Sequence, residues 1–188
     1  MDRPDGLLIV GDGAQRIYPG AFTLRQAGVE VRGRTTVLRQ NYRNTSEILR
    51  TSMAVAGRGQ FVDMGDEPED GPRQRDGESG EPIRSGPRPL LVDCGDDDSE
   101  NEFLAKQIRS LVDSETVDLG DIGVFVLINR AVSSTVRRLR NSDIPATRLT
   151  TYDGVPTPEV KVGNYKRSKG LEFKVVFLPR VKAGYVPR

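Results

Sequence analysis

Histidine is absent from this 188-residue chain, and cysteine occurs once, as Cys94. Without histidine, Ser-His-Asp and Cys-His catalysis are excluded, and so is any metal site that needs an imidazole ligand. A single cysteine excludes an internal disulfide framework and is typical of a reducing compartment. No stretch approaches the ~18 consecutive apolar residues of a membrane span, and no secretory signal pattern is present. We therefore expect a cytoplasmic protein that makes no membrane contact.

Opposite charges are almost balanced over the whole chain but are separated along it. The 28 basic and 27 acidic side chains give a formal net charge of +1. Residues 1–61 hold nine basic and five acidic side chains, a net charge of +4. Residues 62–129 hold six basic and eighteen acidic side chains, a net charge of −12. Residues 130–188 hold thirteen basic and four acidic side chains, a net charge of +9. The basic last third suggests a polyanion such as nucleic acid, although a basic surface that only keeps the fold soluble fits the charges equally well.

Apolar runs alternate with amphipathic stretches, and this alternation predicts an α/β fold with a mainly parallel sheet. The run from Ile122 to Ile128 is apolar almost throughout, as expected of a strand that is covered on both faces. Cap residues and apolar spacing predict helices at 14–18, 46–56, 97–112 and 133–140. Short apolar runs predict strands at 7–10, 36–38, 89–93, 122–128, 144–149, 160–162 and 174–178.

Residues 62–88 differ from the rest of the chain. They contain five glycines, four prolines and twelve charged residues. Such a stretch cannot bury enough apolar surface to offset the entropy of ordering it, so we expect a long flexible loop. We favour an insertion inside one domain over a linker between two, because the segment before it is too short to form its own core.

Three short segments carry polar side chains in positions that suit phosphate chemistry. Gln15 follows a strand and a Gly-Asp turn, where a neutral amide can orient a water or sense a terminal phosphate. Arg43 stands just before a helix N-cap, and its planar guanidinium suits phosphate oxygens. Between Ser168 and Phe173, a Ser-Lys-Gly turn exposes backbone N–H groups, and Glu172 can accept from a ribose hydroxyl. Each segment taken alone also fits a simpler interpretation: a strand turn, a surface arginine or a solvated helix.

Taken in order, the three segments resemble motifs III, IV and V of the UvrD/Rep-like superfamily 1 DNA helicases. The matching stretches are GDxxQxIY from Gly11, LRxNYRNTxxIL from Leu38 and SKGLEFxxVxL from Ser168. In that family, two RecA-like domains enclose ATP and move along single-stranded DNA in the 3′-to-5′ direction. The resemblance implies a three-layer RecA-like domain with a mainly parallel sheet and without a P-loop of its own.

The resemblance assigns five residues to the ATP site. Gln15 would couple the γ-phosphate to the DNA track, and Arg43 would be the arginine finger; these two are the expected catalytic residues. Tyr42 would lie against the adenine. Gly170 and Glu172 would meet the nucleotide from the second domain, with Glu172 near the ribose.

The resemblance assigns three further residues to DNA. Tyr18 would lie near the bound bases, and Lys169 would belong to the loop that joins the ATP and DNA sites. Lys166 stands where the family usually has a histidine. We expect it to take over the contact of that histidine with the DNA backbone.

Two features of the ATP site are missing from the chain. It contains no GxxxxGK[ST] sequence, and no Asp-Glu pair follows an apolar strand ahead of Gly11. By the resemblance, residues 1–36 are the C-terminal tail of the first, ATP-binding RecA-like domain, and residues 37–188 are the second RecA-like domain. Only residues 150–159 stand where UvrD and Rep carry a large accessory domain.

The expected partners are therefore single-stranded DNA and the missing ATP-binding domain of the same parent chain. ATP and Mg²⁺ would act in that parent enzyme, whereas the fragment alone is expected to bind neither tightly and to be inactive as an ATPase. No metal ligands are assigned within it. An alternative is a non-enzymatic nucleic-acid-binding or interaction module with a degenerate helicase fold. Gln15, Arg43 and Glu172 favour the helicase, because a pure binding module has no use for a set of residues that senses the γ-phosphate of a nucleotide.

Overall fold

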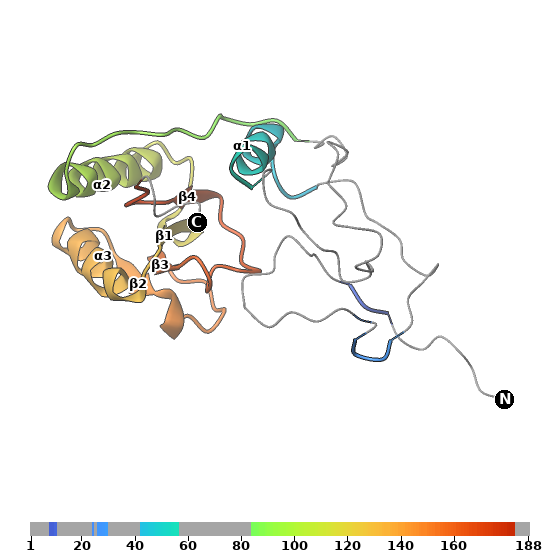
Figure 1. Cartoon of the computed structure of the whole chain (residues 1–188). Helices are drawn as coiled ribbons and strands as arrows, with labels where there is room; N and C mark the ends of the chain where they lie inside the picture. Colours follow the sequence, from blue (N-terminus) through green and yellow to red (C-terminus); the bar gives the residue numbers. More distant parts are fainter. Residues whose placement is uncertain (1–7, 11–23, 25, 30–41, 57–83, 183–188) are drawn as a thin grey trace. The chain divides into compact units, whose positions relative to one another are not determined.

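The structure is a computed structural model that describes residues 8–10, 24, 26–29, 42–56 and 84–182. The chain forms two compact units, Met1–Leu91 and Val92–Arg188 (Figure 1). Four predictions lie outside the described residues, wholly or for the most part: the helix at 14–18, the strand at 36–38, the domain boundary after residue 36 and the loop at 62–88. The boundary stays a prediction.

The first unit contains helix α1, Ser46–Ala56, which confirms the helix predicted over 46–56. Thr45, which precedes it, pairs with Arg84 in an isolated parallel bridge. The backbone N–H of Ser46 also donates to the carbonyl of Arg84 at 2.9 Å. The described segments on either side of residues 57–83 therefore meet at the N-terminus of α1.

The second unit is built on a four-stranded sheet in which every pair is parallel. Its strands are β1 (Ile122–Val126), β2 (Ala146–Arg148), β3 (Val160–Asn164) and β4 (Val175–Phe177), in the order β2-β3-β1-β4. Val124 in the central strand β1 lies opposite Val162 on one side and Phe177 on the other. Because all strands run the same way, their carboxyl ends lie at one edge of the sheet. The predicted α/β class and parallel sheet are confirmed.

Two long helices belong to the second unit, α2 (Asp97–Asp113) and α3 (Asn129–Asn141). The side chain of Asp96 caps α2 by accepting from the backbone N–H groups of Asp98 and Ser99, at 3.0 and 2.8 Å. Helix α3 begins four residues earlier than Ser133, the predicted start, because it follows β1 almost directly. Two 3₁₀ turns, η3 (Leu119–Asp121) and η4 (Leu149–Thr151), flank the strands. Within the described ranges, no helix has the length and apolar content needed to cross a membrane.

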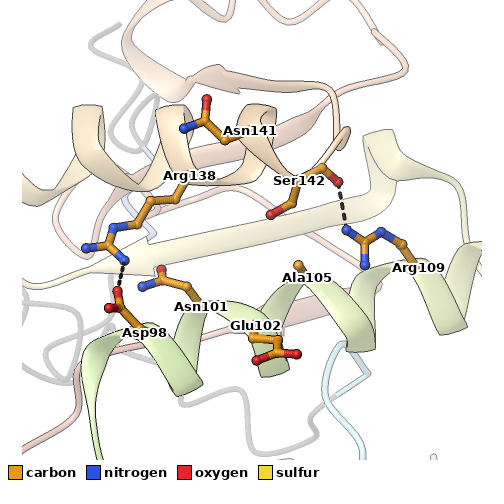
Figure 2. A pocket seen from close by; sticks show the side chains of 8 residues that line it. All are labelled: Asp98, Asn101, Glu102, Ala105, Arg109, Arg138, Asn141 and Ser142. Atoms are coloured by element: carbon orange, nitrogen blue, oxygen red, sulfur yellow. Dashed lines mark hydrogen bonds and ion pairs between the residues drawn. The ribbon is translucent and has the colours of Figure 1, made fainter.

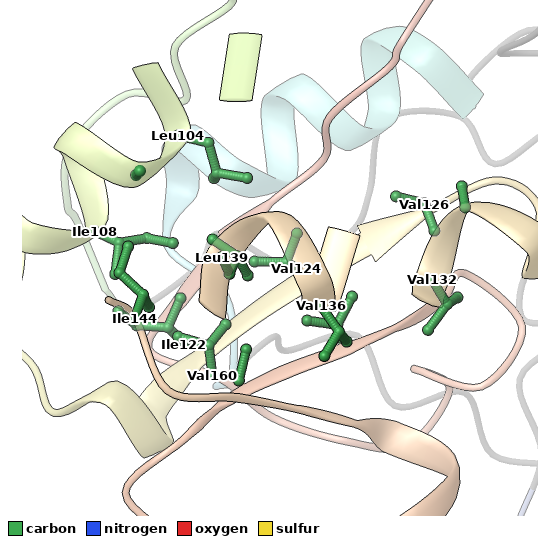
Figure 3. Packing of buried hydrophobic residues seen from close by; sticks show 14 of the residues in the cluster. Leu104, Ile108, Ile122, Val124, Val126, Val132, Val136, Leu139, Ile144 and Val160 are labelled. Carbon is green, nitrogen blue, oxygen red and sulfur yellow. The ribbon is translucent and has the colours of Figure 1, made fainter. Parts of the chain in front are cut away.

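The hydrophobic core lies between the two helices and one face of the sheet (Figure 3). Alternate residues of β1 and β3 point into it, as the period of two in a strand requires. Burying each such aliphatic side chain contributes about 1.5–3 kcal/mol to the free energy of unfolding. The principal members of the cluster are Leu104, Ile108, Ile122, Val124, Val126, Val132, Val136, Leu139, Ile144, Val160 and Val162.

The other residues of the two central strands face the opposite side of the sheet. There the ring of Phe125 meets Phe173 edge to face, with centroids 5.4 Å apart and an interplanar angle of 65°. A Cβ on Gly123 would come within 2.8 Å of the Phe125 ring and 3.0 Å of Phe173, so this position accommodates only hydrogen. Lys161 is buried on the same side, with 2% of its surface exposed. Strand β1 is thus covered on both faces, as predicted from its apolar run.

Two predicted strands do not form. Leu8, Ile9 and Val10 lie in irregular, exposed backbone, so the strand at 7–10 is wrong for its described residues. Residues 89–93 are also irregular, and Leu90 and Leu91 are 84% and 92% exposed. A strand needs a neighbour for its backbone groups, and apolar composition alone does not supply one.

Candidate functional site

The first group of expected site residues lies just before α1. Tyr42 is 64% exposed, and Arg43 is exposed beside it, two residues ahead of the bridge at Thr45. Gln15 and Tyr18 lie outside the described residues. Of the residues assigned to motifs III and IV, the structure therefore places Tyr42 and Arg43, which precede the first turn of α1. Other residues hold the N-terminus of that helix.

Glu47, in the first turn of α1, makes those contacts. Its Oε1 accepts from the hydroxyl of Ser85 at 2.9 Å, and its Oε2 accepts from the backbone N–H of Gly86 at 2.9 Å. The hydrogen bond from Gly86 is the largest cause that lowers the pKa of Glu47 to about 2. Residues 84–86, at the end of the loop predicted over 62–88, are therefore attached to α1 rather than loose.

The second group lies in the loop that follows β3, at the carboxyl edge of the parallel sheet. Asn164 ends the strand, and its carbonyl accepts from the backbone N–H groups of Arg167 and Ser168 at 3.1 and 3.3 Å. Its side-chain Oδ1 accepts from the same Arg167 N–H at 2.9 Å. The hydroxyl of Ser168 donates to the carbonyl of Tyr165 at 2.8 Å, and Leu171 N–H donates to the carbonyl of Ser168 at 3.1 Å. These bonds close residues 164–171 into a compact, helix-like series of turns.

This loop presents positive charge to solvent. Lys166, Arg167 and Lys169 are all exposed, so three cations lie within four residues of one another. Gly170 follows with a φ of +82°, in the left-handed region, and nothing lies within 4 Å of the position a Cβ would take. Glycine is needed there by its backbone conformation and not by crowding. Arg167 was not among the predicted site residues, although the run Lys-Arg-Ser-Lys pointed to it.

The end of the segment is anchored to the sheet. Phe173 packs on Phe125, and Nζ of Lys174 forms an ion pair with Oδ2 of Asp121 at 2.7 Å. The backbone N–H of Lys174 donates to the Asp121 carbonyl at 3.0 Å. The hydrogen bond between the two side chains lowers the pKa of Asp121 and raises that of Lys174. Glu172 is exposed directly before these anchors. The structure thus brings Lys166, Lys169, Gly170 and Glu172 together in one loop of the second unit.

A hollow of about 300 Å³ lies elsewhere, between α2 and α3 (Figure 2). Arg138 Nη1 forms an ion pair with Asp98 Oδ1 at 2.9 Å across it, and Arg109 Nη2 donates to the carbonyl of Ser142 at 2.9 Å. These contacts join the two helices. None of the expected site residues lines this hollow.

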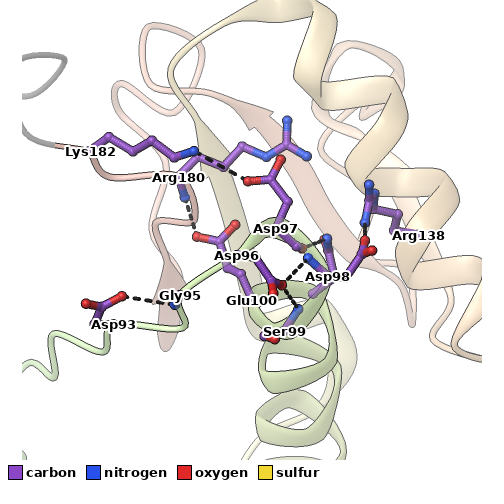
Figure 4. Close-up of polar contacts among 11 residues, drawn as sticks. Asp93, Gly95, Asp96, Asp97, Asp98, Ser99, Glu100, Arg138, Arg180 and Lys182 are labelled. Atoms are coloured by element: carbon purple, nitrogen blue, oxygen red, sulfur yellow. Dashed lines mark hydrogen bonds and ion pairs between the residues drawn. The ribbon is translucent and has the colours of Figure 1, made fainter.

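The acidic start of α2 is also occupied by contacts within the second unit (Figure 4). Glu100 Oε1 accepts from the backbone N–H of Arg180 at 2.7 Å, and Lys182 Nζ lies 3.5 Å from Asp97 Oδ1. These contacts tie the chain that leaves β4 to α2. Among the residues that the structure places, no group of three or more His, Cys, Asp or Glu side chains has the arrangement of a metal site.

Comparison of the chain with family models, with curated proteins and with solved structures finds no match.

Proposed function

We propose that this chain is part of an ATP-dependent DNA helicase or translocase of the UvrD/Rep type, most of it forming the second RecA-like domain. The order of the three motif-like segments supports the proposal. So does the placement of one of them, because ligands of open α/β sheets bind at the carboxyl ends of the parallel strands. Residues 164–171 lie at that edge, directly after the central strand β3.

The observation that carries the proposal is the exposed cluster of Lys166, Arg167 and Lys169 on this loop. Exposed cations at the edge of a sheet contribute little to packing, whereas they suit the phosphates of a nucleic acid strand. In the proposed enzyme, Lys166 and Lys169 contact the DNA backbone, and Tyr18 lies near the bases.

ATP would be held between this chain and a P-loop domain of the parent enzyme. Gly170 fits such a role, because the open space at its Cα lets the backbone approach a ligand closely. Glu172 has an exposed carboxylate in the same loop, and Tyr42 and Arg43 are exposed ahead of α1. Magnesium would neutralise charge on the phosphates, and the P-loop domain would supply its ligands. In this proposal Gln15 senses the γ-phosphate, and Arg43 stabilises charge during phosphoryl transfer.

The proposal is tested by the binding of a fluorescent oligo(dT) of about 20 nucleotides to the 188-residue chain, followed by anisotropy over a range of salt concentrations. The double variant Lys166→Ala/Lys169→Ala is expected to bind roughly 10-fold more weakly or worse. Its slope of log K against log salt should be shallower by about 1.4, since each lost phosphate contact on a single strand removes about 0.7.

A matched control is Lys106→Ala/Lys182→Ala, which removes two exposed lysines of α2 and of the chain beyond β4. It changes the net charge by the same amount and is expected to keep nearly the wild-type affinity. If both double variants lose affinity equally, only overall charge matters and the site assignment is wrong. If the wild-type chain binds no oligonucleotide, the proposed DNA contact fails altogether.

A further inference from the structure

The loop that carries the lysines is joined to the neighbouring strand by a pair of asparagines. Asn164 is the last residue of β3. Asn129 is the first residue of α3 and directly follows the exposed Leu127 and Ile128, which come after β1. The side-chain Nδ2 of Asn164 donates a hydrogen bond to Oδ1 of Asn129. Strands β1 and β3 are adjacent and parallel, so this bond links their carboxyl ends.

Both the nitrogen and the oxygen of the Asn164 side-chain amide form hydrogen bonds. While Nδ2 is held by Asn129, Oδ1 accepts from the backbone N–H of Arg167, at 2.9 Å. This second bond has the geometry of a helix N-cap, in which a side-chain oxygen receives an N–H three residues later. Fixing one end of a planar amide fixes the direction of the other end, so Asn129 determines where the cap of the loop points.

Resting on the function proposed above, we propose that Asn129 and Asn164 are a positioning pair for the basic loop. The pair holds residues 165–170 in the conformation that presents Lys166 and Lys169 to the phosphates of single-stranded DNA. Neither asparagine contacts DNA in this proposal. Asn129 acts only through Asn164, and Asn164 acts through the turn that it caps.

A stabilising role in α3 does not account for Asn129. The N-cap position of α3 is held by Ile128, and the side-chain oxygen of Asn129 accepts from Asn164 of the neighbouring strand. Alanine has a higher helix propensity than asparagine, so Asn129→Ala is not expected to weaken α3. Asn141, at the other end of α3, is a matched control of the same residue type: it is exposed and belongs to the same helix.

The test combines hydrogen exchange with DNA binding, both on the 188-residue chain. In Asn129→Ala, the amide of Arg167 is expected to exchange about 3–10-fold faster, the effect of one lost hydrogen bond, while the melting temperature is unchanged. Affinity for fluorescent oligo(dT) is expected to fall by about the same factor. Asn141→Ala should match the wild type in both measurements. Asn129→Asp keeps an oxygen acceptor for Asn164 and should restore slow exchange at Arg167.

Each outcome decides the proposal. The positioning role is supported if Asn129→Ala shows faster exchange at Arg167 together with weaker DNA binding, while Asn141→Ala shows neither change. Unchanged exchange overturns it, as does faster exchange with unaltered affinity. If the wild-type chain fails to bind DNA, the proposed function is wrong, but exchange at Arg167 still shows whether Asn129 holds the loop. Failure of Asn129→Asp to restore slow exchange overturns the positioning role as well.

Discussion

Lys161 gives the sharpest test of how this fold is held together. It lies in the second strand from the edge of the sheet, 2% exposed, where an aliphatic residue would be ordinary. Its Nζ donates to the Thr157 hydroxyl at 2.7 Å, to the Thr157 carbonyl at 3.0 Å and to the Glu159 carbonyl at 2.7 Å. The ammonium also lies 5.2 Å from the centre of the Tyr152 ring. One buried cation therefore satisfies three oxygens of the chain that enters β3.

Replacing Lys161 with methionine keeps the unbranched shape and removes all three donors. Hydrogen bonds that involve a charged group contribute about 1.5–3 kcal/mol each, which sets an upper bound of several kcal/mol. Burial lowers the pKa of Lys161, and the desolvation responsible offsets part of this gain. Thr157 and Glu159 are only half-buried, so water can reach some of the freed oxygens. We expect a net loss of about 2 kcal/mol in the free energy of unfolding.

Urea unfolding followed by circular dichroism measures this loss, with Lys106→Met as an exposed lysine control expected within about 0.5 kcal/mol of wild type. The variant Thr157→Val removes one of the three acceptors. Combined with Lys161→Met, it should show a coupling energy of about 1 kcal/mol, because the two residues share a hydrogen bond. A Lys161→Met protein as stable as the wild type, or more stable, would refute the reasoning. It would show that desolvation of the cation outweighs its hydrogen bonds.

Three other predictions concern the sheet, the ion pair behind the loop and the proposed ATP site. Gly123→Ala should lower the free energy of unfolding by about 1–3 kcal/mol in urea titrations, because the new methyl group overlaps the Phe125 and Phe173 rings. Lys174 lowers the pKa of Asp121 below its ordinary value of 3.8. The ion pair therefore stabilises the fold fully at a pH above that ordinary value, and this stabilisation is lost as the pH falls through the lowered pKa. The stability difference between wild type and Asp121→Asn, measured by melting curves, should therefore vanish in strong acid. In an enzyme that also carries the P-loop domain, Arg43→Ala should lower DNA-stimulated ATP turnover by roughly 10³-fold or more, with little effect on stability. Normal turnover in that variant would contradict the arginine-finger proposal.

Much of the second unit could be predicted from hydrophobic pattern and cap chemistry. The candidate cap Asp96, followed by apolar residues at intervals of three and four positions, predicts α2, and the structure confirms both the helix and its cap. The apolar run from Ile122 likewise predicted β1, which is buried at every residue. These features are local, so the residues that form each element also carry its signal.

Features that depend on pairing could not be predicted in the same way. Leu90 and Leu91 have the apolar character of a strand, yet they lie in irregular backbone and are 84% and 92% exposed. Lys161 has the polar character of an outward-facing strand residue, yet Tyr152, Thr157 and Glu159 surround it. The hydrogen-bond partners of Lys161 lie only two and four residues before it, but the alternation of a strand does not reveal that the preceding chain turns back onto this side chain.

The candidate site shows the same division. The turn at Gly170 was predictable from a Ser-Lys-Gly sequence, and its φ of +82° agrees with that reading. The hydrogen bond between Asn129 and Asn164 joins residues 35 apart and has no counterpart in either segment alone. The bonds that tie Glu47 to Ser85 and Gly86 span a similar separation. Long-range polar contacts of this kind orient a site, and they become visible only when the strands have been placed.

The segment from Ser168 to Lys174 serves the sheet as well as the proposed site, and its two roles can be separated. Phe173 packs on Phe125, Lys174 pairs with Asp121, and Gly170 permits a left-handed turn, so the fold alone accounts for these three residues. The side chains of Lys169 and Glu172, and that of Lys166 before them, are exposed. A resemblance carried only by the first set would indicate a shared architecture. The helicase proposal uses the exposed side chains of the second set, and substitutions there therefore test function with little disturbance of the fold.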